Sequence, residues 1–164
     1  MTRVFLIGDL MLGRGIDQIL RHPCDPRLDE DYMRSALDYV RLAEQANGPI
    51  PRGVGLDYVW GDAAATLAAA RPDWGIVNLE TAITDDGVPA PKGINYRMSV
   101  RNAEGLTALG ISCCVLANNH MLDWEEQGLG DTLGALQALR LPAAGAGLNA
   151  RETAAPAVLS HAGG

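Results

Sequence analysis

Three short apolar runs, each followed closely by polar side chains, constrain the fold of this chain more than any other feature of its sequence. The runs cover residues 3–7, 75–79 and 112–117, and their length and apolar content are typical of buried strands. Residues with helical spacing lie between and after them, so strands alternate with helices along the chain. The sequence therefore predicts an α/β fold with a largely parallel sheet.

The segments between these runs carry weaker signals. An Ala-rich helix is expected from Asp62 to the residue before Pro72, and another up to about Arg140 behind an Asp123–Glu126 capping box. Further elements are a helix around residues 32–45, a short helix from Asn102 to Gly110, an exposed strand over 94–100, and short strands over 143–147 and 157–160. We interpret the Pro-, Asp- and Arg-rich residues 22–55 as an excursion from a single domain, residues 1–164.

Polar residues that can bind a metal or move a proton follow each of the three runs. They are Asp9, Glu80 and the pair Asn119–His120. Because the carboxyl ends of parallel strands share one edge of a sheet, these side chains should meet in one cleft there. Carboxylate, amide and imidazole groups suit a divalent ion such as Mn²⁺ or Zn²⁺, and a neighbouring His can protonate a leaving group. Taken singly, each residue is better explained as a loop residue that satisfies backbone groups. Their coincidence at three strand ends favours a site.

Six segments, in order over nearly the whole chain, form a recognisable set. They are GDLMLGRG (8–15), YVWGD (58–62), NLETAIT (78–84), KGINYRM (92–98), LANNHMLDW (116–124) and GAGLNARETAAP (145–156). Together they resemble the poly-γ-glutamate capsule biosynthesis protein CapA family, a branch of the calcineurin-like metallophosphoesterases. The resemblance implies a metallophosphatase-like β-sandwich flanked by helices, with a dinuclear metal centre that hydrolyses phosphoesters.

The resemblance also implies roles for the residues at matching positions. Asp9, Glu80 and Asn119 match metal ligands, and His120 matches a catalytic imidazole. The candidates for holding an anionic substrate are Arg14, Lys92, Arg97 and Asp123. For the three cations, solvated surface charge is the simpler explanation, and for Asp123 a helix N-cap is an equal one.

Two departures from the superfamily pattern predict an incomplete centre. Met11 stands where the first motif of the wider superfamily has a histidine, and a thioether is a poor ligand for hard divalent ions. The superfamily adds histidines from the second half of its fold, whereas His22 and His161 lie outside the matched segments. We therefore interpret the chain as about half of a family domain, with an unpaired apolar strand at 157–159 that invites association into a homo-oligomer or with a missing half. Weak metal binding and little hydrolysis are expected.

The charge balance excludes several other classes of protein. With 13 Lys and Arg against 20 Asp and Glu, the net charge is −7 and no basic cluster exists, so nucleic acid is not an expected partner. A bound metal would supply the positive charge that a small anionic substrate, such as a phosphoester, requires. No apolar run approaches the roughly 18 residues of a membrane span and no signal peptide is visible, so a cytoplasmic location is expected. The three cysteines lack the spacing of a zinc site or a disulfide framework.

Two function classes fit these patterns. The first is a metal-dependent phosphoesterase-like hydrolase, and the second is a binding or structural module that keeps the fold without turnover. A GDSL-type serine esterase is excluded because Leu10 occupies the position of the nucleophile. A dinucleotide-binding fold is excluded because Gly8, Gly13 and Gly15 lack the GxGxxG spacing.

Overall fold

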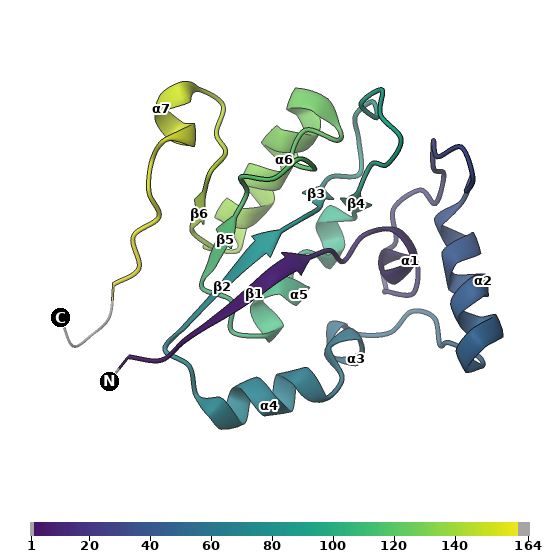
Figure 1. Cartoon of the computed structure of the whole chain (residues 1–164), viewed down its shortest axis with the longest axis horizontal. Coiled ribbons are helices and arrows are strands. Elements are labelled where there is room, and N and C mark those ends of the chain that lie inside the picture. The colour runs from purple at the N-terminus through teal and green to yellow at the C-terminus, as the bar shows by residue number, and fades with distance from the viewer. Residues whose placement is uncertain (1, 161–164) are drawn as a thin grey trace.

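The computed structural model describes residues 2–160 as a mixed α/β fold with a parallel sheet flanked by helices, which confirms the expected fold class (Figure 1). The strands are β1 (Val4–Leu10), β2 (Trp74–Leu79), β3 (Ala82–Ile83), β4 (Arg97–Met98), β5 (Cys113–Val115) and β6 (Ala143–Ala144). The helices are α1 (Arg14–Asp17), α2 (Ala36–Asn47), α3 (Leu56–Trp60), α4 (Asp62–Ala70), the 3₁₀ helix η1 (Val100–Asn102), α5 (Gly105–Ala108), α6 (Glu125–Ala138) and α7 (Ala150–Thr153).

The main sheet has the strand order β1-β2-β5-β6, and every neighbouring pair in it is parallel. The carboxyl ends of the first three strands therefore share one edge, as the alternation of strands and helices predicted. The pairing of β1 with β2 shifts between Ile7 and Asp9, so that Asp9 lies opposite Asn78. Because the ladder continues across this irregularity, β1 extends to Leu10 instead of ending at residue 7 as predicted.

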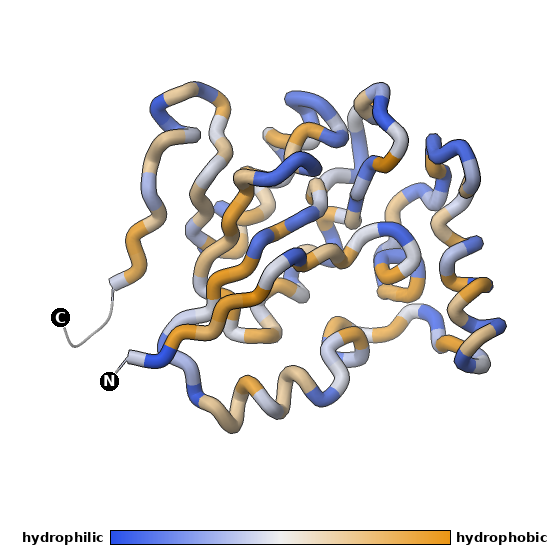
Figure 2. The backbone as a smooth tube through the Cα atoms, in the orientation of Figure 1, coloured by the Kyte–Doolittle hydropathy of each residue, from blue (hydrophilic) through white to orange (hydrophobic). Residues whose placement is uncertain are grey.

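One face of the main sheet carries the hydrophobic core. Val77, Leu79, Leu106 and Leu136 are fully or almost fully buried there, and partly buried residues of α3 and α4 pack against the same core. In Figure 1 the strands are drawn in front of α5 and α6. The other face is apolar and more open, since Val4 is 50% exposed and Leu6 is 74% exposed (Figure 2). The prediction that all three apolar runs are buried is therefore wrong for β1.

Several predicted element ends differ from the structure. The strand expected over residues 94–100 is reduced to β4, in which Met98 is buried, and η1 follows it with Ser99 as the N-cap in place of Asn102. Residues 155–160 form neither helix nor strand, so the unpaired strand expected over 157–160 is not present, although Val158 is 76% exposed. His161, which lies outside the matched segments and was not expected to complete the metal centre, is also outside the described residues.

The Pro-rich excursion, residues 22–55, packs beside the start of the chain. Its one helix, α2, begins after Ser35, whose hydroxyl accepts from the Leu37 N–H, and it packs against α1 (Figure 1). A short parallel bridge joins Leu20 to Val54 and fixes the far end of the segment. No helix in residues 2–160 is long and apolar enough to span a lipid bilayer.

Candidate functional site

Two carboxylates from neighbouring strands meet at the carboxyl edge of the sheet. Asp9 is near the end of β1, and Glu80 directly follows β2. The amide nitrogen of Asn78 donates to Asp9 Oδ1 at 2.8 Å and to Glu80 Oε2 at 2.5 Å. The strand register that sets Asp9 opposite Asn78 is thus what brings the two acids together.

The charged form of Glu80 is disfavoured at this edge. Burial raises the pKa of Glu80 above its ordinary value, and the neighbouring carboxyl of Asp9 raises it further, whereas Asn78 and His120 lower it. Carboxylates that repel in this way are stabilised when a cation lies between them. The arrangement therefore favours positive charge at this edge.

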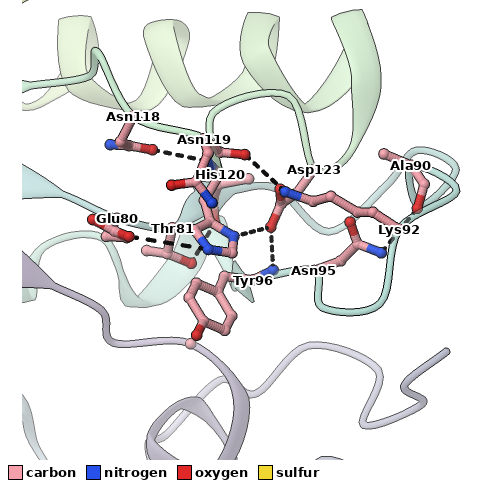
Figure 3. A network of polar contacts seen from close by, with 12 residues as sticks. Glu80, Thr81, Ala90, Lys92, Asn95, Tyr96, Asn118, Asn119, His120 and Asp123 are labelled. Atoms are coloured by element: carbon pink, nitrogen blue, oxygen red, sulfur yellow. Dashed lines mark hydrogen bonds and ion pairs between the residues drawn. The ribbon is translucent and has the colours of Figure 1, made fainter. Parts of the chain in front are cut away.

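His120 lies beside Glu80 with one ring nitrogen held and the other facing the acid. Its Nδ1 is 2.7 Å from Asp123 Oδ2, and its Nε2 is 4.0 Å from Glu80 Oε1 (Figure 3). The Tyr96 ring stacks on the imidazole with centroids 3.9 Å apart and an interplanar angle of 17°. These contacts fix the ring so that Nε2 is directed toward Glu80.

Asp123 is fully buried and serves as the anchor of this network. Its carboxylate also accepts from the Tyr96 backbone N–H and pairs with the Lys92 ammonium (Figure 3). The capping box predicted for Asp123 is therefore wrong: Trp124 occupies the N-cap position of α6, and no side chain caps that helix. The Asp123 carboxylate makes charge-assisted contacts with the side chains of His120 and Lys92 in place of a cap bond.

The two adjacent asparagines contribute differently. Asn118 donates to Asn78 Oδ1 at 3.0 Å and to the Leu79 carbonyl at 2.8 Å, and its own oxygen accepts from the His120 N–H. Asn119 is exposed, and its backbone carbonyl accepts from Lys92 Nζ at 2.7 Å. Sequence reasoning named Asn119 and passed over Asn118 and Asn78, although all three stand in the matched motifs.

The three cations proposed to hold substrate each have a partner within the protein. Arg14 pairs with the buried carboxylate of Glu30 at 2.7 Å and lies over the Tyr39 ring. Arg97 lies 3.9 Å from the centre of the Trp124 ring. Lys92 joins Asp123 to the Asn119 carbonyl. Free solvated charge thus does not describe these side chains.

The glycine-rich loop after β1 is closely packed beneath the site. The Met11 sulfur, at the position where a histidine ligand was expected, accepts from the Gly13 N–H at 3.2 Å. A Cβ on Gly13 would lie only 2.4 Å from the Arg97 carbonyl oxygen, so only glycine fits there. The Met11 sulfur therefore makes a hydrogen bond within the loop itself.

By donor chemistry, these residues suit a hard divalent ion. Two carboxylates, neighbouring amide groups and one imidazole nitrogen are oxygen and nitrogen donors of the kind that Mn²⁺ accepts. The buried acid behind His120 Nδ1 is also the usual partner of a metal-binding histidine. Among the described residues, however, no group of three or more His, Cys, Asp or Glu side chains is arranged to hold a metal.

Comparison with known proteins identifies relatives over most of the chain. A family model described as "Bacterial capsule synthesis protein PGA_cap" matches residues 3–164. Two similar proteins, from the CDC 1551 and H37Rv strains of Mycobacterium tuberculosis, are each named "Probable polyglutamine synthesis accessory protein". Each is 52% identical to this chain over 145 residues, which cover 88% of this chain. The match covers 38% of each relative, so the chain spans well under half of their length.

Proposed function

The chain belongs to the bacterial capsule synthesis protein PGA_cap family, and on this premise we propose that it acts in polyglutamate-type capsule synthesis as a metal-dependent phosphoester hydrolase. The observation that carries the proposal is the meeting of Asp9, Glu80 and His120 at one sheet edge. The family description supports a role in capsule synthesis, and the names of the M. tuberculosis proteins support a role in polyglutamine synthesis. The resemblance of the sequence motifs to those of metallophosphoesterases supports the reaction.

In this proposal Asp9, Glu80 and Asn119 hold the divalent ion, Mn²⁺ or Zn²⁺, with Asn118 and Asn78 fixing their positions. When bound, the ion would supply Lewis acidity toward a phosphoryl group. With Nδ1 donating to Asp123, the protonated form of His120 would carry a second proton at Nε2 and pass it to a leaving oxygen, which leaves a neutral imidazole. Lys92 pairs with the buried Asp123 and so holds this carboxylate in place behind the ring.

A second candidate function is a binding module without turnover. It is favoured by the lack, among the described residues, of three acidic, His or Cys side chains arranged around a metal. The amide group of Asn78 already spans Asp9 and Glu80, so this edge is a stable polar surface without an ion. Such a module would bind the anionic substrate without cleaving it.

The two functions are separated by measuring metal binding and turnover on the same 164-residue chain. Thermal unfolding with and without Mn²⁺ is compared for the wild type, Glu80→Gln, and Glu126→Gln, an exposed acid on α6 that serves as a matched control. Hydrolysis of an aryl phosphate is then compared with that of His120→Ala. We expect Mn²⁺ to raise the unfolding temperature of the wild type and of Glu126→Gln, but not that of Glu80→Gln. The turnover of the wild type is expected to be low, and His120→Ala should reduce it by at least about 100-fold.

Other outcomes choose between the alternatives. Stabilisation by Mn²⁺ without turnover would support the binding module. Equal Mn²⁺ effects on the wild type and Glu80→Gln, together with turnover that does not depend on His120, would overturn the proposed site.

A further inference from the structure

A polar cleft away from the candidate site lies between the end of α1, the start of α3 and η1. Its volume is about 320 Å³, and the residues that give it its character are Arg21, His22, Leu56, Arg101, Asn102 and Glu104. None of them belongs to the network around His120. The cleft is large enough for a small organic molecule, since ligand pockets begin at about 300 Å³.

The walls of the cleft are fixed by buried hydrogen bonds. Asn102 is 2% exposed, and its amide nitrogen donates to the His22 carbonyl at 3.0 Å and to Asp17 Oδ1 at 2.8 Å. On the side of the cleft formed by residues 54–56, the Val54 N–H donates to the Ile19 carbonyl at 3.0 Å. Segments 80 residues apart in the sequence are thus joined by hydrogen bonds within the protein itself.

Two arginines on this cleft have no partner. In residues 2–160, neither the Arg21 nor the Arg101 guanidinium makes an ion pair or a hydrogen bond, whereas Arg14, Arg27, Arg41 and Arg52 each pair with an acid. Glu104 is the one carboxylate among the residues that line the cleft. In a chain of net charge −7, two unpaired arginines against one carboxylate around one cavity are a local excess of positive charge.

We propose that this cleft binds a small organic phosphate. A phosphate group offers several anionic oxygens that two guanidinium groups from separate segments can share, whereas a planar carboxylate is matched by one guanidinium. The cavity is larger than a phosphate ion, so the remainder of the molecule lies against Leu56 and the Asn102 wall. The site is independent of the proposed hydrolysis.

The test is a calorimetric titration of the 164-residue chain with inorganic phosphate, in the presence of EDTA and without added metal. The variants are Arg21→Ala and Arg101→Ala, and the matched control is Arg151→Ala, an exposed arginine on α7. His120→Ala reports any binding at the candidate site, and glutarate in place of phosphate reports carboxylate recognition. Circular dichroism confirms that each variant is folded.

We expect saturable phosphate binding that each cleft substitution weakens at least tenfold. Arg151→Ala and His120→Ala should bind as the wild type does, and glutarate should bind more weakly than phosphate. Absent binding, or equal affinities for Arg21→Ala and Arg151→Ala, would overturn the site. Binding lost only in His120→Ala would assign the anion to the other site, and glutarate binding as tight as phosphate would overturn the phosphate assignment.

Discussion

Replacement of Asp17 by alanine should destabilise the chain more than any exposed substitution. Asp17 has no exposed surface, and its carboxylate accepts from the Cys24 N–H at 2.7 Å, the Ser99 N–H at 3.0 Å and the Asn102 amide at 2.8 Å. Alanine would remove the acceptor of three hydrogen bonds: those from the buried Ser99 N–H and the half-buried Cys24 N–H, and one of the two that the Asn102 amide donates. At about 1–3 kcal/mol for each such group, with partial relaxation, the expected loss is about 3–6 kcal/mol. Total stabilities are typically about 5–15 kcal/mol, so this is a large part of the whole.

Asparagine at the same position separates hydrogen bonding from packing. Its oxygen can keep the two donors that share Asp17 Oδ1, from Ser99 and Asn102, while its amide nitrogen opposes the Cys24 N–H. Only one donor then loses its acceptor. The expected loss for Asp17→Asn is about 1–3 kcal/mol, roughly a third to a half of that for alanine.

Urea unfolding followed by circular dichroism measures both variants, with Asp29→Ala as an exposed control that should stay within about 0.5 kcal/mol. With a slope of about 2 kcal/mol per molar, the Asp17→Ala midpoint should fall by about 1.5–3 M. Equal losses for the alanine and asparagine variants would refute the hydrogen-bond reasoning. An alanine variant within 1 kcal/mol of the wild type, on the scale of an ordinary substitution, would do so as well.

Three further predictions concern the candidate site and the thiols. Burial and Asp9 raise the pKa of Glu80, so protonation of Glu80 favours the folded state, and stability is lost as the pH rises above 4.5. Glu80→Gln should therefore stabilise the metal-free chain at neutral pH and not at acidic pH. Thermal unfolding across this pH range checks this prediction. Gly13→Ala should cost about 1–3 kcal/mol in urea unfolding, because its Cβ would lie 2.4 Å from the Arg97 carbonyl oxygen; an unchanged midpoint would contradict that packing. Burial raises the pKa of Cys24 to about 12, so iodoacetamide should label this thiol slowly at pH 8 and much faster in urea, as mass spectrometry can show.

The meeting of Asp9, Glu80 and His120 was predictable because it depends on a rule that local pattern is enough to apply. Each follows or ends an apolar run, and parallel strands bring their carboxyl ends to one edge. In the structure Asn78 joins Asp9 to Glu80, and His120 Nε2 lies 4.0 Å from Glu80, whereas Asn119, expected in the same cluster, is exposed and contacts Lys92 through its backbone carbonyl. The roles of these residues as metal ligands and proton donor stay predictions.

The partners of individual charges could not be predicted. The spacing of Asp123 and Glu126 fits a capping box, yet the Asp123 carboxylate binds His120 and Lys92. The partner of Arg14 is Glu30, in a segment that sequence patterning marks only as an excursion. A hydrophobic pattern reports which face of an element is buried, and it carries no information on which distant side chain meets a given charge.

The sequence by itself determined the class of fold, the edge that carries the polar residues and the family. These follow from alternating apolar runs and ordered motifs, which are local properties of the chain. Only the tertiary structure decided that Asp123 anchors His120, that Asn118 and Asn78 join the site, and that Arg21 and Arg101 share a cleft. Some of those contacts join residues that are distant in sequence, and others replace a competing local hydrogen bond. Both kinds depend on packing, because a buried polar group pairs with whichever partner the fold places near it.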